Sequence, residues 1–181
     1  MRPMRRVLIG LLGLVVGGLA APVGAGPAFA REAVQPGPEV VAFRDEAVPG
    51  SIVIRTGERR LYLVLDQGTA LRYVVGVGRA GRQWSGASVI DGKYRNPNWE
   101  PPAAVRRDQP GLPVVILAGS PANPMGVAAM TLSGGDYAIH GTNAPESIGG
   151  FVSYGCIRMY NSDIADLFDR VGLGTPVKVE P

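Results

Sequence analysis

Short runs of β-branched and aromatic residues, separated by glycine, proline and polar turn residues, dominate the chain from about residue 51 onwards. Such runs are typical of β-strands, and strong helical periodicity is rare here. The pattern therefore predicts a mostly β fold with minor α content. The expected strands are residues 51–56, 60–65, 70–77, 114–118, 127–132, 137–140 and 176–180, with a hairpin turn at residues 66–69.

One helix is predicted near the C-terminal end. Ile164, Leu167, Phe168 and Val171 recur at the i, i+3, i+4, i+7 spacing of a helix with one apolar face. Either of the two residues at 161–162, Asn161 or Ser162, can cap its start, and Gly172 is expected to end it.

Residues 78–113 are expected to form a long irregular connection that contains Trp84, Trp99 and several prolines. An ordered connection of this length is uncommon unless it has a function, such as walling a groove. The preceding segment, residues 76–81, matches the glycine pattern of dinucleotide-binding proteins. However, no apolar helical stripe follows it to hold a pyrophosphate, so we interpret it as a glycine-rich turn.

The first thirty residues resemble an export signal rather than part of a fold. Three arginines precede an apolar run of about fifteen residues, and Ala28-Phe29-Ala30 forms a small-x-small cleavage site. The alternative is an uncleaved membrane anchor, for which this run is short. We therefore expect residues 1–30 to be a signal peptide, 31–50 an extended lead-in and 51–181 one folded domain in the periplasm or cell envelope, with no stable membrane span after cleavage.

The charge balance changes when the signal peptide is removed. The whole chain has 18 Lys and Arg against 15 Asp and Glu, and three of the arginines lie within residues 1–30. The remainder is formally neutral and has no basic cluster, so a nucleic-acid partner is not expected.

The chain has one histidine, His140, and one cysteine, Cys156, and each lies beside glycine in a turn. Cysteine attacks acyl carbons as the thiolate, and an imidazole is the usual base that generates it. Each residue also has a simpler interpretation, as a structural histidine and a small buried thiol. One His and one Cys lack the partners of a zinc site, so no metal and no cofactor are expected.

Neighbouring residues extend this candidate site. Gly155 permits an unusual backbone angle, and successive main-chain N–H groups in such a turn can point at one spot as an oxyanion hole. Arg158 alternates with Cys156 and either binds a substrate carboxylate or is an ordinary surface arginine.

Three segments resemble the signature of the L,D-transpeptidase catalytic domain family (YkuD-like): residues 137–143, 147–149 and 152–159. They include His140-Gly141-Thr142-Asn143 and Ser153-Tyr154-Gly155-Cys156-Ile157-Arg158-Met159. The resemblance extends from about residue 51 to 179. It implies a β-sandwich of mixed sheets with the thiol in a groove and one helix after the catalytic cysteine. It also implies action on peptidoglycan stem peptides, in which the cysteine attacks an L–D bond, a terminal D-amino acid leaves and an amine resolves the thioester.

By this resemblance Cys156 is the nucleophile, His140 the base, and Gly155 and Cys156 the oxyanion donors. Arg158 and Ser153 match family positions, and Ser153 is expected to orient the turn. Six residues are expected to bind substrate: Gly141, Thr142, Asn143, Ser153, Tyr154 and Arg158. Tyr154 departs from the family, which commonly has histidine there.

The resulting prediction is a cofactor-free L,D-transpeptidase of the cell wall. The acceptor amine stays open between another stem peptide and the terminal lysine of an envelope lipoprotein. Two rival functions remain: a carboxypeptidase or amidase that passes the same acyl group to water, and a non-catalytic peptidoglycan-binding module. Papain-like peptidases place the cysteine before the histidine, the reverse of the order found here.

Overall fold

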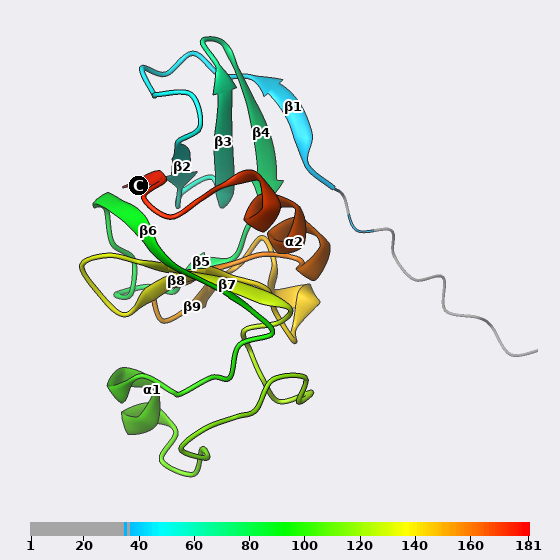
Figure 1. The fold of residues 1–181 in the computed structure, drawn as a ribbon. Coiled ribbons are helices and arrows are strands. Elements are labelled where there is room, and N and C mark those ends of the chain that lie inside the picture. The colour runs from blue at the N-terminus through cyan, green and yellow to red at the C-terminus, as the bar shows by residue number, and fades with distance from the viewer. Residues whose placement is uncertain (1–34, 36) are drawn as a thin grey trace, which may run out of the picture. The chain divides into compact units, whose positions relative to one another are not determined.

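The structure is a computed structural model that describes residue 35 and residues 37–181, so the expected signal peptide lies outside the described residues (Figure 1). Its strands are β1 Glu39–Ala42, β2 Ile52–Arg55, β3 Arg60–Asp66, β4 Thr69–Val74, β5 Val77–Gly78, β6 Gly86–Arg95, β7 Ala128–Leu132, β8 Tyr137–His140, β9 Phe151–Ser153, β10 Ile157–Arg158 and β11 Pro176–Glu180. Its helices are α1 Ala103–Asp108, α2 Asn161–Arg170 and a 3₁₀ turn at Pro145–Ser147.

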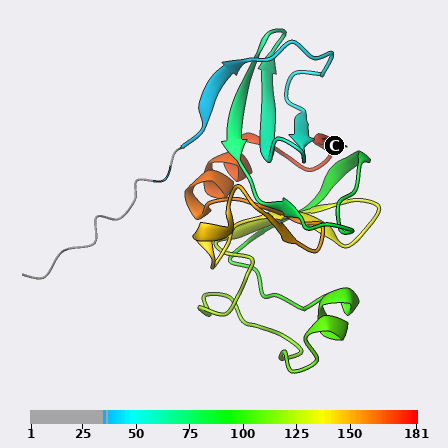
Figure 2. The ribbon, with the colours of Figure 1, turned by 180° about the vertical axis from the view of Figure 1, so that it is seen from behind.

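Nine strands form a mixed sheet in the order β1-β4-β3-β2-β11-β6-β7-β8-β10, and β5 pairs with β9. The β11–β2 and β10–β8 pairs are parallel, and the other six pairs in the nine-stranded sheet are antiparallel. The expectation of a mostly β fold with mixed sheets is confirmed. Figures 1 and 2 show β1–β4 on one side of the domain and β6–β9 on the other.

Strand β6 joins these two halves. Its first part pairs with β11 and its second part with β7, with an irregularity between Ile90 and Gly92. A bulge bends a strand and increases its twist, so the sheet can fold over on itself. The two halves enclose one apolar core, built from residues such as Ile54, Met130 and Ile139.

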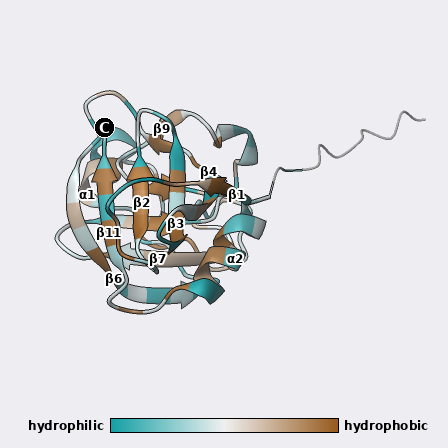
Figure 3. Cartoon of the chain, turned by 90° about the horizontal axis from the view of Figure 1, so that it is seen from above, coloured by the Kyte–Doolittle hydropathy of each residue, from teal (hydrophilic) through white to brown (hydrophobic). Residues whose placement is uncertain are grey.

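Helix α2 closes this core. Ile164, Leu167 and Phe168 are buried, and Val171, directly after the helix, is buried too, as the spacing predicts. Figure 3 shows the helix with both hydrophobic and hydrophilic faces. Its carbonyl end is held by Lys93 of β6, whose Nζ donates to the main-chain oxygens of Phe168 (2.6 Å) and Val171 (2.5 Å).

The N-cap lies one or two residues before the predicted one, whereas Gly172 directly follows the C-cap Val171, as expected. The N-cap is Tyr160, with no side-chain capping bond, and the helix stops at Arg170, before Gly172. Asn161 does not cap the helix because its amide side chain bonds to the main chain of Thr142 instead.

Two further predictions are corrected. The connection at residues 78–113 contains the ten-residue strand β6 and the short helix α1. Residues 114–118 form no strand and contribute a single bridge between Ile116 and Trp99. Glycine, serine and lysine in β6 obscured its alternation of buried and exposed positions.

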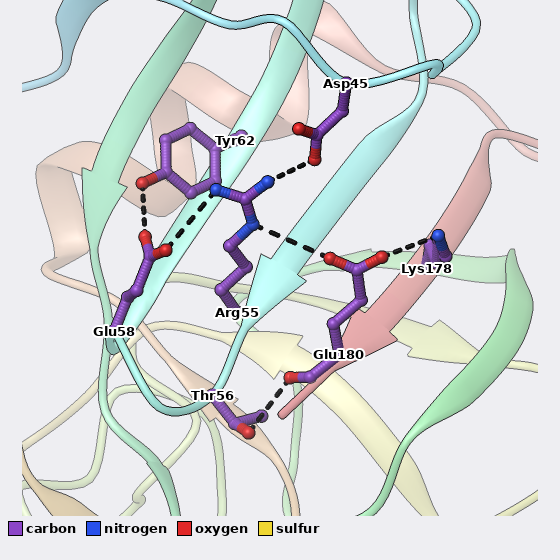
Figure 4. Close-up of polar contacts among 7 residues, drawn as sticks. All are labelled: Asp45, Arg55, Thr56, Glu58, Tyr62, Lys178 and Glu180. Atoms are coloured by element: carbon purple, nitrogen blue, oxygen red, sulfur yellow. Dashed lines mark hydrogen bonds and ion pairs between the residues drawn. The ribbon is translucent and has the colours of Figure 1, made fainter.

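The segment at residues 31–50 contains an edge strand, because β1 pairs with β4 and places Phe43 in a small second core. Arg55 holds this segment to the rest of the domain, as Figure 4 shows. Its guanidinium pairs with Asp45, with Glu58 at 3.3 Å and with Glu180 at 3.6 Å. It also lies near the rings of Phe43 and Tyr62, at 5.5 and 5.4 Å from their centroids.

No helix within the described part of the chain is long and apolar enough to cross a bilayer.

Candidate active site

Two neighbouring parallel strands bring the histidine and the cysteine together. In the β8–β10 pair, Ile157 lies opposite Ile139 and Arg158 lies opposite His140, and Cys156 directly precedes β10. A cavity of about 290 Å³ opens over this edge, here named the Cys156 cavity. Its lining includes His140, Ser153, Tyr154, Cys156 and Arg158. The structure therefore places the predicted nucleophile, base and arginine around one cavity.

His140 is arranged to accept a proton. Its side chain is only 4% exposed, and its Nδ1 lies 2.7 Å from the carbonyl oxygen of Gly141. This contact requires a proton on Nδ1, so Nε2 carries no proton in the neutral imidazole, and the main chain of Pro124 makes a second contact with the ring. Burial, followed by the positive charge of Arg158, lowers the pKa of His140 to about 4. The imidazole is therefore neutral at pH 7.

Cys156 is partly exposed, and burial raises the pKa of its thiol, although the Arg158 charge opposes this effect. Its Sγ lies 3.9 Å from the carbonyl oxygen of Asp136. The side chains of Cys156 and His140, both within the described residues, share no direct hydrogen bond. The resting site is thus a neutral thiol beside a neutral imidazole, rather than the imidazole-stabilised thiolate suggested by the sequence.

The turn before the thiol is tied together by Ser153. Its Oγ accepts a hydrogen bond from Gly155 N–H (3.0 Å) and donates one to the carbonyl oxygen of Cys156 (2.6 Å). Gly155 has a φ of 125°, and a Cβ there would lie 2.5 Å from Cε1 of Tyr137. Only glycine fits this position.

The expected pair of oxyanion donors is revised by these bonds. Gly155 N–H already donates to Ser153, so it does not point freely at a substrate. The N–H of Cys156 is the remaining candidate donor of this turn. Ser153 supports the turn, as the sequence suggested, and it also lines the Cys156 cavity.

Arg158 is half-buried, its Nε has no hydrogen-bond partner among the described residues, and burial lowers its pKa. An unpaired buried guanidinium N–H is costly. The guanidinium is therefore suited to an anionic group that enters the cavity, and it remains charged near neutral pH.

Tyr154 connects the cysteine turn to the cavity wall. Its hydroxyl donates to Asp108 at the end of α1 (2.8 Å), and Arg79 pairs with the same carboxylate oxygen (2.8 Å). The Arg79 guanidinium also lies 4.1 Å from the centroid of the Tyr154 ring. Trp99, Pro102 and Val105 line the cavity, in agreement with the expectation that the long connection walls a groove.

Gly141, Thr142 and Asn143 are not among the described residues that line the Cys156 cavity. Gly141 and Thr142 are buried, and the Asn143 side chain donates to the carbonyl of Pro121 (2.9 Å). Contact of these three residues with substrate stays a prediction.

A model of the L,D-transpeptidase catalytic domain matches residues 49–179 of this chain. The chain belongs to the L,D-transpeptidase catalytic domain family. The match covers the Cys156 cavity, helix α2 and the sheet except for β1 and the last residue of β11.

Similar proteins agree with the family. The probable L,D-transpeptidase ErfK/SrfK of Escherichia coli K12 is 41% identical over 143 residues, which are 74% of this chain and 45% of that protein. The probable L,D-transpeptidase YbiS of the same organism is 38% identical over 142 residues, with the same two shares. This chain thus spans about half the length of these relatives.

The fold is also shared with solved L,D-transpeptidases. L,D-transpeptidase 3 from Mycobacterium tuberculosis, in complex with a faropenem-derived adduct, superposes with a TM-score of 0.56 at 17% identity. The superposition covers 72% of this chain and 60% of that one. At this identity the likeness concerns the fold alone.

Two residues of this L,D-transpeptidase domain were not predicted to support the site. Asn161 Oδ1 accepts from Thr142 N–H and its Nδ2 donates to Thr142 O, both at 3.0 Å, which anchors the turn that contacts His140. Trp84 Nε1 donates to the carbonyl oxygen of Gly155 (3.0 Å). The sequence signal for Asn161 was an amide beside a helix start, which equally suits a cap.

Proposed function

We propose that this domain is a peptidoglycan L,D-transpeptidase whose nucleophile is Cys156. The observation that carries the proposal is the Cys156 cavity itself. A thiol, a buried imidazole with its proton on Nδ1, and a guanidinium whose Nε has no partner among the described residues meet there. The substrate is a stem peptide with an L–D bond before a terminal D-amino acid.

In the first step, Sγ attacks the carbonyl carbon of the L–D bond while its proton passes to Nε2 of His140. The low pKa of His140 makes the imidazolium a strong acid, which then protonates the leaving amine. The C–N bond breaks, the D-amino acid leaves and Cys156 holds the acyl group as a thioester.

In the second step, an amine attacks the thioester and His140 takes its extra proton. The new amide forms, the C–S bond breaks and the thiol returns. Arg158 favours the thiolate as it forms and suits a carboxylate of the donor peptide. Cys156 N–H donates to the oxyanion of each tetrahedral intermediate.

The acceptor is either a second stem peptide or the terminal lysine of an envelope lipoprotein. If water resolves the thioester in place of the amine, the enzyme is a carboxypeptidase or amidase. If the site binds the stem peptide without forming a thioester, the domain is a non-catalytic wall-binding module. The proposal includes export, with a mature chain that begins at Arg31 and is recovered from the envelope. An envelope form that retains Met1 would contradict cleavage.

The test is mass spectrometry of purified wall fragments incubated with the mature protein and with Cys156→Ala. Transpeptidation predicts loss of a D-amino acid and a new amide-linked product, both absent with Cys156→Ala. Release without a linked product favours the hydrolase. Binding without release, or turnover by Cys156→Ala, would reject the proposal.

A further inference from the structure

We propose that Trp84 is a positioning residue that aims the N–H of Cys156 at the substrate oxyanion. The inference rests on the proposed function and concerns a residue outside the thiol, imidazole and guanidinium set. Its basis is the hydrogen bond from Trp84 Nε1 to the carbonyl oxygen of Gly155, at 3.0 Å.

The bonded carbonyl and the oxyanion donor belong to one peptide unit. The peptide group between Gly155 and Cys156 is planar, and its C=O and N–H point in opposite directions in the trans form. No peptide bond is cis among the described residues. A bond that holds the Gly155 carbonyl toward Trp84 therefore turns the Cys156 N–H away from Trp84.

The other main-chain polar groups of this turn are also occupied. Ser153 Oγ binds the N–H of Gly155 and the carbonyl oxygen of Cys156. With Trp84 on the remaining carbonyl, three of the four polar groups of these two residues have partners, and the fourth is the Cys156 N–H. This pattern is that of a preorganised donor, whose direction is set before substrate arrives.

Trp84 is itself held in place. Its ring stacks on Tyr137 of β8, with centroids 4.5 Å apart and planes 9° apart, and both rings pack against the main core. Tyr137 also lies where a Cβ on Gly155 would stand. The glycine thus lets the turn lie against this aromatic pair, within reach of the indole N–H.

Comparing the rates of acylation and alkylation of the Cys156 thiol distinguishes a positioning role of Trp84 from a general structural role. Acylation passes through an oxyanion, whereas displacement of iodide from iodoacetamide does not. Loss of an oriented N–H therefore slows acylation alone, whereas a displaced or poorly ionised thiol slows both reactions.

The experiment compares wild type with Trp84→Phe, which keeps an aromatic ring for the stack and removes the N–H. p-Nitrophenyl acetate is the acyl donor and iodoacetamide the alkylating reagent, both measured across pH. We expect acylation to fall about tenfold, below the 10²–10³-fold typical of deleting a donor outright, with alkylation within about twofold. Unchanged acylation, or equal loss in both reactions, would overturn the proposal.

A second measurement on the wild-type chain stands even where Trp84→Phe does not fold. The chain has two tryptophans, so ¹⁵N-labelled protein gives two indole N–H signals, assigned with Trp99→Phe. We expect the Trp84 signal to exchange slowly with solvent and to shift on acylation of Cys156. A fast-exchanging signal that does not move would reject the hydrogen bond. Because p-nitrophenyl acetate requires no wall substrate, failure with stem peptides alone would count against the proposed function and not against this inference.

Discussion

Arg158 lies directly opposite His140 in the parallel pairing of β10 with β8. One guanidinium therefore acts on both partners of the dyad. It lowers the pKa of the imidazole and also lowers that of the Cys156 thiol, against the raising effect of burial. The arginine favours a neutral base and a more acidic nucleophile at the same time.

Arg158→Gln is expected to raise the pKa of His140 from about 4 toward its ordinary value and to raise the pKa of the thiol. Since the chain has one histidine, NMR titration of its C2 proton reports the first change without overlap. The pH profile of iodoacetamide alkylation reports the second. A His140 pKa that stays the same in Arg158→Gln would contradict the electrostatic coupling.

His140→Ala should slow acylation by the 10²–10⁴-fold typical of a lost general base. Cys156→Ala should abolish acylation, and Cys156→Ser should be nearly inactive, because a hydroxyl is a far poorer nucleophile than a thiolate.

A carbapenem should acylate the wild type, since its strained lactam offers the thiolate an acyl carbon. Intact-protein mass spectrometry tests this, and an adduct that persists in Cys156→Ala would exclude the cysteine mechanism.

Tyr154 and Asp108 should act as one unit, because the tyrosine hydroxyl donates to the carboxylate that also binds Arg79. Tyr154→Phe and Asp108→Asn should each raise KM for a stem peptide more than they lower kcat. The double variant should cost less than the sum of the two. Steady-state kinetics of the four proteins measures this, and strict additivity would show that the contact does not hold the cavity wall.

Asn161→Leu should destabilise the domain by about 1–3 kcal/mol, because Thr142 loses a donor and an acceptor beside a buried turn. The same change should slow acylation, since this turn supplies the Gly141 carbonyl that fixes the His140 tautomer. Ser162→Ala, at the exposed neighbouring position, leaves Thr142 untouched and removes only a 3.4 Å hydrogen bond to Asp163; it is the matched control and should change stability by less than about 0.5 kcal/mol. Urea unfolding compares them, and equal effects would discount the anchor.

Asp163 of α2 is 2% exposed, and burial raises its pKa to about 6. Because the folded-state pKa lies above the unfolded value, this residue's contribution to stability is greatest at low pH and is lost as pH rises through about 6. Asp163→Asn should therefore stabilise the domain by about 1–2 kcal/mol at pH 7.5 and by little at pH 4.

Asp166, one turn later, is the control for that prediction. Its bonds to Arg170 lower its pKa, so its stabilisation is present at neutral pH and is lost as pH falls. Asp166→Asn should destabilise at pH 7.5, the opposite sign to Asp163→Asn. Thermal unfolding at the two pH values compares them, and the same sign for both variants would contradict the assigned burial.

Local patterns predicted the parts of the fold that depend on near neighbours. The apolar stripe of α2 and the strands at residues 137–140 and 176–180 were predicted because side-chain periodicity reports burial directly. Strand β6 was missed because glycine, serine and lysine occupy several of its positions, so its alternation of buried and exposed positions does not appear as alternating apolar and polar residues. The short strands β5 and β10 carry too few residues to show any period.

The sequence by itself determined which groups are available for chemistry. With one thiol and one imidazole, each beside a glycine turn, the candidate dyad and the turn that needs Gly155 could be named without coordinates. Tertiary structure alone decided their state. The effect of Arg158 on the pKa of His140 and the bond from Trp84 to Gly155 both join residues that are far apart in the sequence or lie on different strands. Burial and hydrogen-bond direction depend on what the folded chain brings alongside each group, and no local pattern encodes that.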